Sequence, residues 1–394
     1  MNIKLLFDKN KSKITSLRKI GRQFKLMTNG QKRCWLYTNN NPNFSGTNIK
    51  SLIHFFNYIN ENDKFYLPII IQLGKVNFED KLVYIVLECI LYYMILKNRR
   101  IIINFTPETN ISTDGISFSP INCINKSYIN IKDYIKFEEK FYHDSQEHHY
   151  RELIEYNEIK TYYLTEISNE LYTFFSKLGI ETDTIEKLCE SIIEIVGNSI
   201  EHGRSDCLID IDVTEEKYKK KNDTEDSFYY GINVVVLGIS DIPFNKKIKT
   251  KLLNIDSLNE RYVKVKEAKQ NHSKYFCSDY SEDDFYTIAS FQHKISGSID
   301  KKNSGGVGLT QLIKSLEEKS SGHLCYMLSG NRALKFQKEF LQYDSECYIG
   351  FNKENDFYEH IPDRTVFANS DTFFPGTAYN LNFAIKKGDL HYGK

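Results

Sequence analysis

The sequence predicts an α/β (α+β) protein with a smaller N-terminal domain and a larger C-terminal domain. Three observations lead to this prediction. Residues 65–107 follow a strand, helix and strand pattern. A long helical pattern at 181–203 is followed by strand patterns at 206–213 and 228–238. The chain also closes with strand patterns, the last of them at 377–385.

Composition limits the class of protein. The 394 residues suffice for two or three domains of about 100–200 residues each. The formal net charge is zero, so no bulk attraction to nucleic acid or to an anionic membrane is indicated. The eight cysteines form no C-x-x-C pair and the longest apolar run, 82–96, is short for a membrane span. We therefore expect a soluble, cytoplasmic protein.

The N-terminal domain (1–140) contains one clear pattern. Residues 65–74 predict a strand, 78–99 a helix that Asp80 or the residues just before it can cap, and 100–107 a second strand. The turn between the first strand and the helix lacks a phosphate-binding glycine motif. We therefore assign this domain no chemistry beyond a role in sensing or in binding a partner.

The two domains are joined by a predicted connecting helix at 141–180. Residues 144–179 carry apolar side chains at helical spacing and end at Gly179. The next helix begins near Thr182 or Asp183, either of which can cap it, and ends at Gly203. The remaining chain, 181–394, forms the predicted C-terminal domain.

A long polar segment interrupts the C-terminal domain at about 245–303. Its composition predicts a mobile lid or insertion rather than a packed element. A glycine turn that opens a helix follows in SGGVGLTQLI (304–313). Strand patterns at 323–330, 332–337 and 377–385 then complete the domain.

Three polar residues recur every four positions on the helix at 181–203. Glu194, Asn198 and His202 therefore lie on one helix face, with neighbours roughly 5–6 Å apart. An amide oxygen suits a hard cation such as Mg²⁺, which takes few protein ligands. A carboxylate one turn earlier can orient or deprotonate a water beside that metal. The spacing thus favours a metal-assisted reaction.

Two glycine-containing segments complete the candidate site. Gly305, Gly306 and Gly308 precede a helix, and bare backbone amides at the positive end of a helix suit phosphate. The helix dipole alone contributes about 0.3–2 kcal/mol to such binding. A Gly-Thr pair at 376–377 opens the last strand.

Taken in order, these segments resemble the Bergerat-fold (GHKL) ATPases, the family of gyrase, histidine kinases and MutL. EIVGNSIEHG (194–203) is similar to the N-box of that family, especially to its version in anti-sigma serine kinases, and SGGVGLTQLI is similar to its second glycine box. The resemblance covers roughly residues 150–386. It implies a histidine-kinase-like domain at 181–394 that is a two-layer α/β sandwich with a mixed sheet.

The resemblance also implies ATP and Mg²⁺ as cofactors and a role for individual residues. Asn198 would ligate Mg²⁺, and Glu194 would act as the general base or orient the attacking water. His202 would lie near the phosphates or the lid, and Thr377 would help to hold adenine. The phosphates would be held by the loop that comprises Gly305, Gly306, Val307, Gly308 and Leu309.

The sequence departs from the family at the adenine-binding box. The family has Asp-x-Gly-x-Gly at the end of the second strand, where this chain has VVVLGISDIPF (234–244). Gly238 matches the first glycine, but Val236 stands at the Asp position and Ser240 replaces the second glycine. Either Asp241 enters the pocket through a changed turn, or the adenine pocket is degenerate.

Three functions stay open. The first is an ATP-binding, slowly hydrolysing switch that changes conformation or dimerises, with a protein partner or a second copy of the chain. The second is a protein kinase that phosphorylates a partner or His148 or His149. The third is a non-enzymatic scaffold with a decayed nucleotide site. A metal site at His143, His148 and His149 is a weaker alternative, because no second cluster of ligands completes it.

Overall fold

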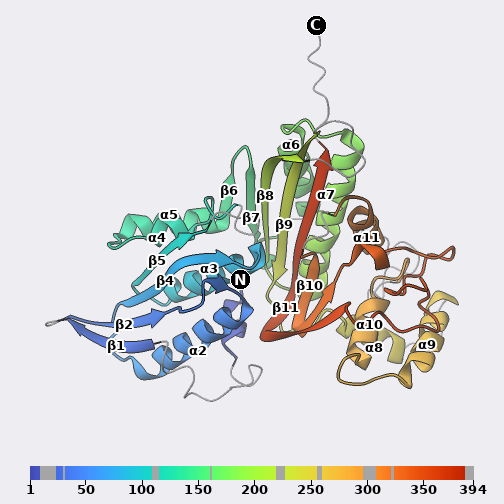
Figure 1. Cartoon of the computed structure of the whole chain (residues 1–394), viewed down its shortest axis with the longest axis horizontal. Helices are drawn as coiled ribbons and strands as arrows, with labels where there is room; N and C mark the ends of the chain where they lie inside the picture. Colours follow the sequence, from blue (N-terminus) through green and yellow to red (C-terminus); the bar gives the residue numbers. More distant parts are fainter. Residues whose placement is uncertain are drawn as a thin grey trace, which may run out of the picture.

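A computed structural model confirms the α/β class and contains two sheets. The smaller sheet belongs to the N-terminal half of the chain and the larger one to the C-terminal half (Figure 1). The structure describes residues 1–8, 24–29, 32–108, 115–159, 162–218, 227–254, 260–295, 308–320 and 324–386.

The N-terminal sheet has mixed strand directions. Its order is β1-β2-β4-β3, and β5 pairs with β4. Strands β2, β3 and β5 run parallel to β4, whereas β1 runs antiparallel to β2. The strands are β1 (Phe24–Asn29), β2 (Lys32–Thr38), β3 (Asn43–Phe44), β4 (Ile69–Phe78) and β5 (Ile101–Pro107). The helices of this half are η1 (Ile3–Phe7), α2 (Gly46–Asn62), α3 (Lys81–Leu96), α4 (Ile121–Ile124) and α5 (Ile131–Tyr142).

The predicted strand, helix and strand pattern at 65–107 is confirmed as β4, α3 and β5. Asp80 is the N-cap of α3, and its carboxylate accepts a hydrogen bond from the Val83 backbone amide at 2.9 Å. Thirteen of the sixteen residues of α3 are buried, because the helix packs between the N-terminal sheet and the larger sheet. The apolar run at 82–96 is therefore a core helix. Within the described ranges, no helix combines the length and the apolarity that a membrane span requires.

The C-terminal sheet has the order β10-β11-β9-β8-β7-β6. The family resemblance implied a mixed sheet here, and this expectation is wrong: the described pairings of the C-terminal sheet are all antiparallel, and the mixed strand directions belong to the N-terminal sheet. The strands are β6 (His143–Ser145), β7 (His149–Ile154), β8 (Cys207–Tyr218), β9 (Ser227–Gly238), β10 (Tyr326–Lys335) and β11 (Phe367–Lys386).

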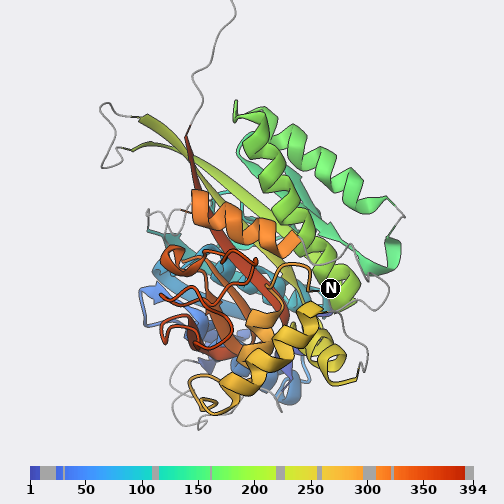
Figure 2. The ribbon, with the colours of Figure 1, turned by 90° about the vertical axis from the view of Figure 1, so that its right-hand side faces the viewer.

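Both faces of this sheet are covered. Alternate residues of a strand point to opposite faces, so Ile209 and Ile211 pack against the helices of the C-terminal half, whereas Leu208 packs against the N-terminal half. The side chains of β9 alternate in the same way: Val236 packs against the helices of the C-terminal half, and Leu237 packs against the N-terminal half. The N-terminal half thus acts as the second cover of the sheet (Figures 1 and 2).

The helix layer of the C-terminal half positions the candidate site. Helix α7 packs between α6 and α11 (Figure 2). A π-helical turn, η4, extends α7 and ends at the C-cap Gly203, as the sequence predicts for the end of this helix. The N-cap of α7 is Glu181 rather than Thr182 or Asp183. These elements are α6 (Tyr163–Ser176), α7 (Thr182–Gly197), η4 (Asn198–His202) and α11 (Gly308–Lys319), with the short turns η3 (Tyr156–Glu158) and η5 (Lys338–Phe340) beside them.

The predicted connecting helix at 144–179 is wrong in its first half. His143–Ser145 and His149–Ile154 are strands β6 and β7, and the described helical residues are those of the short turn η3 and of α6. Strand β7 pairs with β8, and its side chains are buried on both faces of the sheet. Because the partners of β7 lie about sixty residues away in the sequence, tertiary pairing overrides the local apolar spacing.

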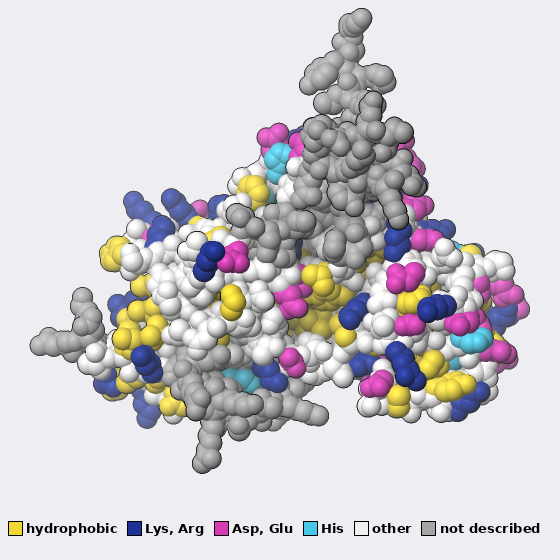
Figure 3. Space-filling view, viewed as in Figure 1, with side chains coloured by type: hydrophobic (Ala, Val, Ile, Leu, Met, Phe, Trp, Pro, Cys, Tyr) yellow, Lys and Arg dark blue, Asp and Glu magenta, His cyan; other side chains and the backbone are white. Residues whose placement is uncertain are grey.

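The segment at 245–303 is a packed element in its described parts, and not the lid-like insertion that its polarity predicts. Three helices form here, and their buried Ile248, Val265 and Phe285 join the core of the C-terminal half. The helices are α8 (Lys246–Asn254), α9 (Glu260–Ser273) and α10 (Glu282–Ala289). They form a lobe that carries interspersed acidic and basic side chains on the face shown in Figure 3. Helices α8 and α9 are largely polar and bury few apolar residues, which explains why the sequence of this segment looks polar.

Candidate functional site

One pocket brings together residues from several elements of the C-terminal half. Glu194 comes from α7, Asn198 and His202 from η4, and Gly308 from the start of α11. Gly238 at the end of β9 and Thr377 in β11 line the same pocket. Leu309 also lines it, whereas Gly305, Gly306 and Val307 lie outside the described residues. The lobe contributes Lys247 from α8.

Glu194 and Asn198 are stacked as their spacing predicts. The Asn198 amide nitrogen donates a hydrogen bond to Glu194 Oε1 at 3.2 Å. Both side chains line the same pocket from adjacent turns of the helix, and each has an oxygen atom that can accept a cation. This arrangement suits a hard cation such as Mg²⁺, which prefers carboxylate and amide oxygens.

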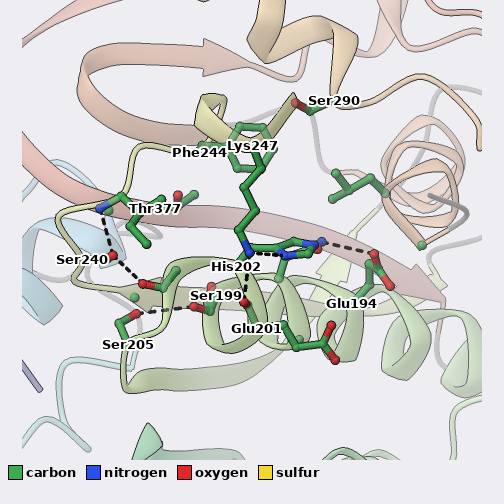
Figure 4. Close-up of a pocket in the computed structure, with 18 of the residues that line it drawn as sticks. Glu194, Ser199, Glu201, His202, Ser205, Ser240, Phe244, Lys247, Ser290 and Thr377 are labelled. Carbon is green, nitrogen blue, oxygen red and sulfur yellow. Dashed lines mark hydrogen bonds between the residues drawn. The ribbon is translucent and has the colours of Figure 1, made fainter. Parts of the chain in front are cut away.

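Helix α7 and its extension η4, together called the motif helix, carry Glu194, Asn198 and His202. The last turn of this helix is a π-turn, which the sequence did not predict. The Gly203 backbone amide donates to the Asn198 carbonyl, five residues earlier. Single π-turns occur frequently at functional sites because they widen the helix and redirect its side chains and carbonyls. Here the turn directs the Glu201 carbonyl and the His202 ring toward Lys247 (Figure 4).

Gly308 is required by its contact with Glu194. A Cβ atom at Gly308 would lie 2.0 Å from Glu194 Cδ, so any larger residue would displace the carboxylate. The Glu194 carboxyl group therefore rests against the first residue of α11. Gly308 thus allows the predicted base and the positive end of α11 to lie in the same part of the pocket.

The Gly-Thr pair lies inside β11 and not at its start, and a close approach of two backbones explains its glycine. Gly376 has a φ of +95°, and a Cβ there would lie 2.1 Å from the Gly238 carbonyl oxygen. Thr377 pairs directly with Gly238 in the sheet. A Cβ at Gly238 would in turn approach Ser205 and Ser199 to 2.9 and 3.1 Å. The two glycines therefore allow β9, β11 and η4 to converge at one end of the pocket.

The structure does not bring Asp241 into the pocket. Asp241 is exposed and does not line it. The turn after β9 is held by Ser240, whose hydroxyl donates to the Gly203 carbonyl at 2.6 Å and accepts from the Ile242 amide at 3.0 Å. Val236, at the position of the family's Asp, is fully buried. This end of the pocket therefore presents hydroxyl groups, from Ser199, Ser205, Ser240 and Thr377 (Figure 4).

Lys247 is a pocket residue that sequence reasoning missed, because it lies in a charged segment without a motif. Its ammonium donates to His202 Nδ1 at 3.0 Å and to the Glu201 carbonyl at 3.1 Å. Burial, followed by the charge of Arg204, lowers the pKa of Lys247. When the ammonium donates this bond, His202 Nδ1 is the acceptor and Nε2 is the ring nitrogen that can carry a proton.

The histidines at 143–149 do not form a metal site. His143 is exposed and contacts Glu152. The His149 side chain, in contrast, is buried. His149 Nδ1 lies 2.8 Å from Asp144, and its Nε2 lies 3.3 Å from Asp210. Both ring nitrogens of His149 are therefore engaged, and a buried ring is a poor phosphoacceptor.

His149 belongs instead to a buried ion network between α3 and the C-terminal sheet. Lys81 of α3 lies 2.6 Å from Asp210 and 2.5 Å from Asp212, both on β8. Arg151 of β7 contacts Asp210 and reaches Glu88 of α3 at 2.5 Å. His149, Asp210 and Asp212 lie close enough to hold a metal ion, but the ammonium and guanidinium groups already occupy the cation positions.

The stability of the protein is expected to fall between about pH 6.5 and pH 9 because of His149. Burial lowers the pKa of His149, but the charge of Asp210 and the hydrogen bond to Asp144 outweigh burial and raise it to about 9. The protonated ring stabilises the fold fully below the unfolded pKa of about 6.5, and this contribution, about 3 kcal/mol at most, is lost as the pH rises through 9. Urea denaturation of wild type and of His149→Gln at pH 6 and pH 9.5 measures it.

The stability difference between wild type and His149→Gln should be large at pH 6 and small at pH 9.5. His143→Gln is the matched control, because that ring lies on the surface of the same hairpin. A difference that is equal at both pH values would contradict the prediction.

Comparisons of the chain with protein-family models, with curated proteins and with solved structures found no match. The resemblance to the GHKL ATPases therefore depends on the motifs and on the pocket in which they meet.

Proposed function

We propose that the chain binds Mg-ATP in this pocket and hydrolyses it slowly, and that occupancy of the pocket drives a conformational switch or dimerisation. The observation that supports this most strongly is the convergence of separate motifs. Glu194, Asn198, Gly308 and Thr377 are up to 183 positions apart in the sequence, yet they line one pocket. Lys247 adds a positive charge to the same pocket.

The polar groups of the pocket divide into two ends. Glu194 and Asn198 lie at the end near the start of α11, where their oxygens fit Mg²⁺. A magnesium ion at that end would neutralise charge on phosphate oxygens. Glu194 is then placed to orient a water molecule or to accept its proton.

The hydroxyl-lined end near Ser240 and Thr377 fits a nucleobase with little selectivity. The carboxylates that line the described pocket are Glu194 and Glu201, and neither lies on the turn after β9. A hydrogen bond from adenine to a carboxylate contributes about 1.5–3 kcal/mol. We therefore expect ATP binding to be roughly ten- to hundredfold weaker than in a pocket that contains such a carboxylate, with reduced discrimination between bases.

ATP with Mg²⁺ is expected to stabilise the wild-type protein, and Glu194→Gln is expected to separate binding from turnover. At one hundred times Kd, ATP should add about 2.7 kcal/mol to the free energy of unfolding. Glu194→Gln keeps the shape of the side chain, so the thermal shift should persist while phosphate release falls about 100-fold or more. Thermal melts and a phosphate-release assay measure the two effects.

Glu190→Gln on the exposed side of α7 is the matched control and should leave both quantities unchanged. Wild-type protein that shows neither a thermal shift nor phosphate release would rule out the proposed function and favour the scaffold. Transfer of radiolabel from γ-labelled ATP to a protein partner would favour the kinase. Transfer to His149 is the less supported route, because both of its ring nitrogens are engaged.

A further inference from the structure

Lys247 crosses the pocket from the lobe to the motif helix. Its neighbours on α8, Ile248 and Leu252, are buried in the core and hold that helix in place. The side chain reaches η4, where its ammonium contacts the His202 ring and the Glu201 carbonyl. In Figure 4 the ammonium lies between the hydroxyl-lined end of the pocket on one side and Glu194 on the other.

The ammonium of Lys247 has no ion-pair partner in the part of the chain that the structure describes. Its hydrogen bonds go to the Glu201 carbonyl oxygen and to a ring nitrogen of His202, and the charge of the Glu201 carboxylate acts on it without forming an ion pair. Two other lysines of the lobe differ in this respect. Lys249 lies 2.7 Å from Asp283, and Lys269 lies 2.6 Å from Glu282.

A partly buried cation that forms no ion pair with a carboxylate of the described residues is complementary to an anionic ligand. Hydrogen bonds between an ammonium and a phosphate oxygen are roughly twice as strong as those between neutral groups. A lysine side chain is also long and flexible enough to exchange one partner for another without moving its helix. The charge of Lys247 is therefore available to a phosphate group that enters between the two ends of the pocket.

We infer that Lys247 binds the phosphate chain of the nucleotide, and that its ammonium leaves His202 and Glu201 for phosphate oxygens when the pocket is occupied. This inference rests on the proposed function and adds a specificity-determining residue to it. The ligand class is a nucleoside di- or triphosphate. A nucleoside without phosphates gains nothing from the exchange, so Lys247 selects for the charged part of the ligand.

Calorimetry with ATP, ADP and adenosine tests the inference on wild type and on Lys247→Met, which keeps the linear side chain and removes the charge. ATP affinity should fall at least tenfold in Lys247→Met, while adenosine affinity stays unchanged. Lys246→Met is the matched control, because Lys246 is the preceding residue of α8 and is exposed. It should bind ATP within twofold of wild type.

A second measurement needs no variant. Reductive methylation of wild-type protein, followed by mass spectrometry, should modify Lys247 more slowly with Mg-ATP than with adenosine, and Lys246 equally in both.

The outcomes distinguish a failure of the proposed function from a failure of the inference about Lys247. Wild type that binds neither ATP nor ADP overturns the proposed function, and the role of Lys247 with it. Wild type that binds ATP overturns the inference alone if Lys247→Met binds it as tightly, or if ATP leaves the methylation of Lys247 unchanged.

Discussion

Asn198→Ala is expected to abolish the magnesium-dependent stabilisation of the protein by ATP. The variant removes the amide oxygen that fits Mg²⁺, and it also removes one hydrogen bond to the Glu194 carboxylate. The whole gain of about 2.7 kcal/mol at one hundred times the wild-type Kd should disappear. Thermal melts with ATP and Mg²⁺, and with ATP and a chelator, measure the magnesium-dependent part.

Asn169→Ala, at an exposed position of α6, is the control for a general effect of losing an asparagine. Asn198→Asp tests the chemistry further, because a carboxylate keeps an oxygen ligand, so part of the magnesium-dependent shift should remain. A magnesium-dependent shift of wild-type size in Asn198→Ala would contradict the assignment of this residue.

Arg151→Met is expected to destabilise the protein by about 3–5 kcal/mol. Arg151 is fully buried, and its guanidinium connects Asp210 of β8 to Glu88 of α3. Its removal leaves both carboxylates buried with fewer partners. Burial already raises the pKa of Glu88, and the Arg151 charge opposes that rise, so Glu88 should bind a proton more readily in the variant. Urea denaturation at pH 7 measures the loss of stability.

The control for Arg151→Met is Lys75→Met, which removes the exposed partner of Glu108 at 3.0 Å. Surface ion pairs contribute about 0–1 kcal/mol, so the control should change the midpoint little. A loss below about 1 kcal/mol for Arg151→Met would mean that the network does not hold the N-terminal half against the C-terminal sheet.

Local patterns predicted the elements whose stabilising contacts are close in the sequence. The strand, helix and strand at 65–107 were found with the Asp80 cap in place, because capping and apolar periodicity involve neighbouring residues. The ends of the motif helix followed in the same way, to within one or two residues. Glu194 and Asn198 meet because helix geometry alone places them on one face.

Strand β7 could not be predicted in this way. Arg151 and His149 look like surface residues of a helix, yet their charges are neutralised by Asp210 and Glu88, which lie about sixty residues away on β8 and α3. The lobe at 245–295 was misread for a related reason. Its few apolar residues, such as Phe285, become a core only when the helices meet.

The sequence by itself determined the motif spacing, the caps and the α/β order, since each depends on backbone periodicity over one or two turns. Tertiary structure alone decided that the N-terminal half covers the back of the C-terminal sheet, that Asp241 stays outside the pocket and that Lys247 reaches into it. The physical reason is that the environment of a charged side chain depends on which groups, distant in the sequence, are buried next to it. Local periodicity carries no information about those groups.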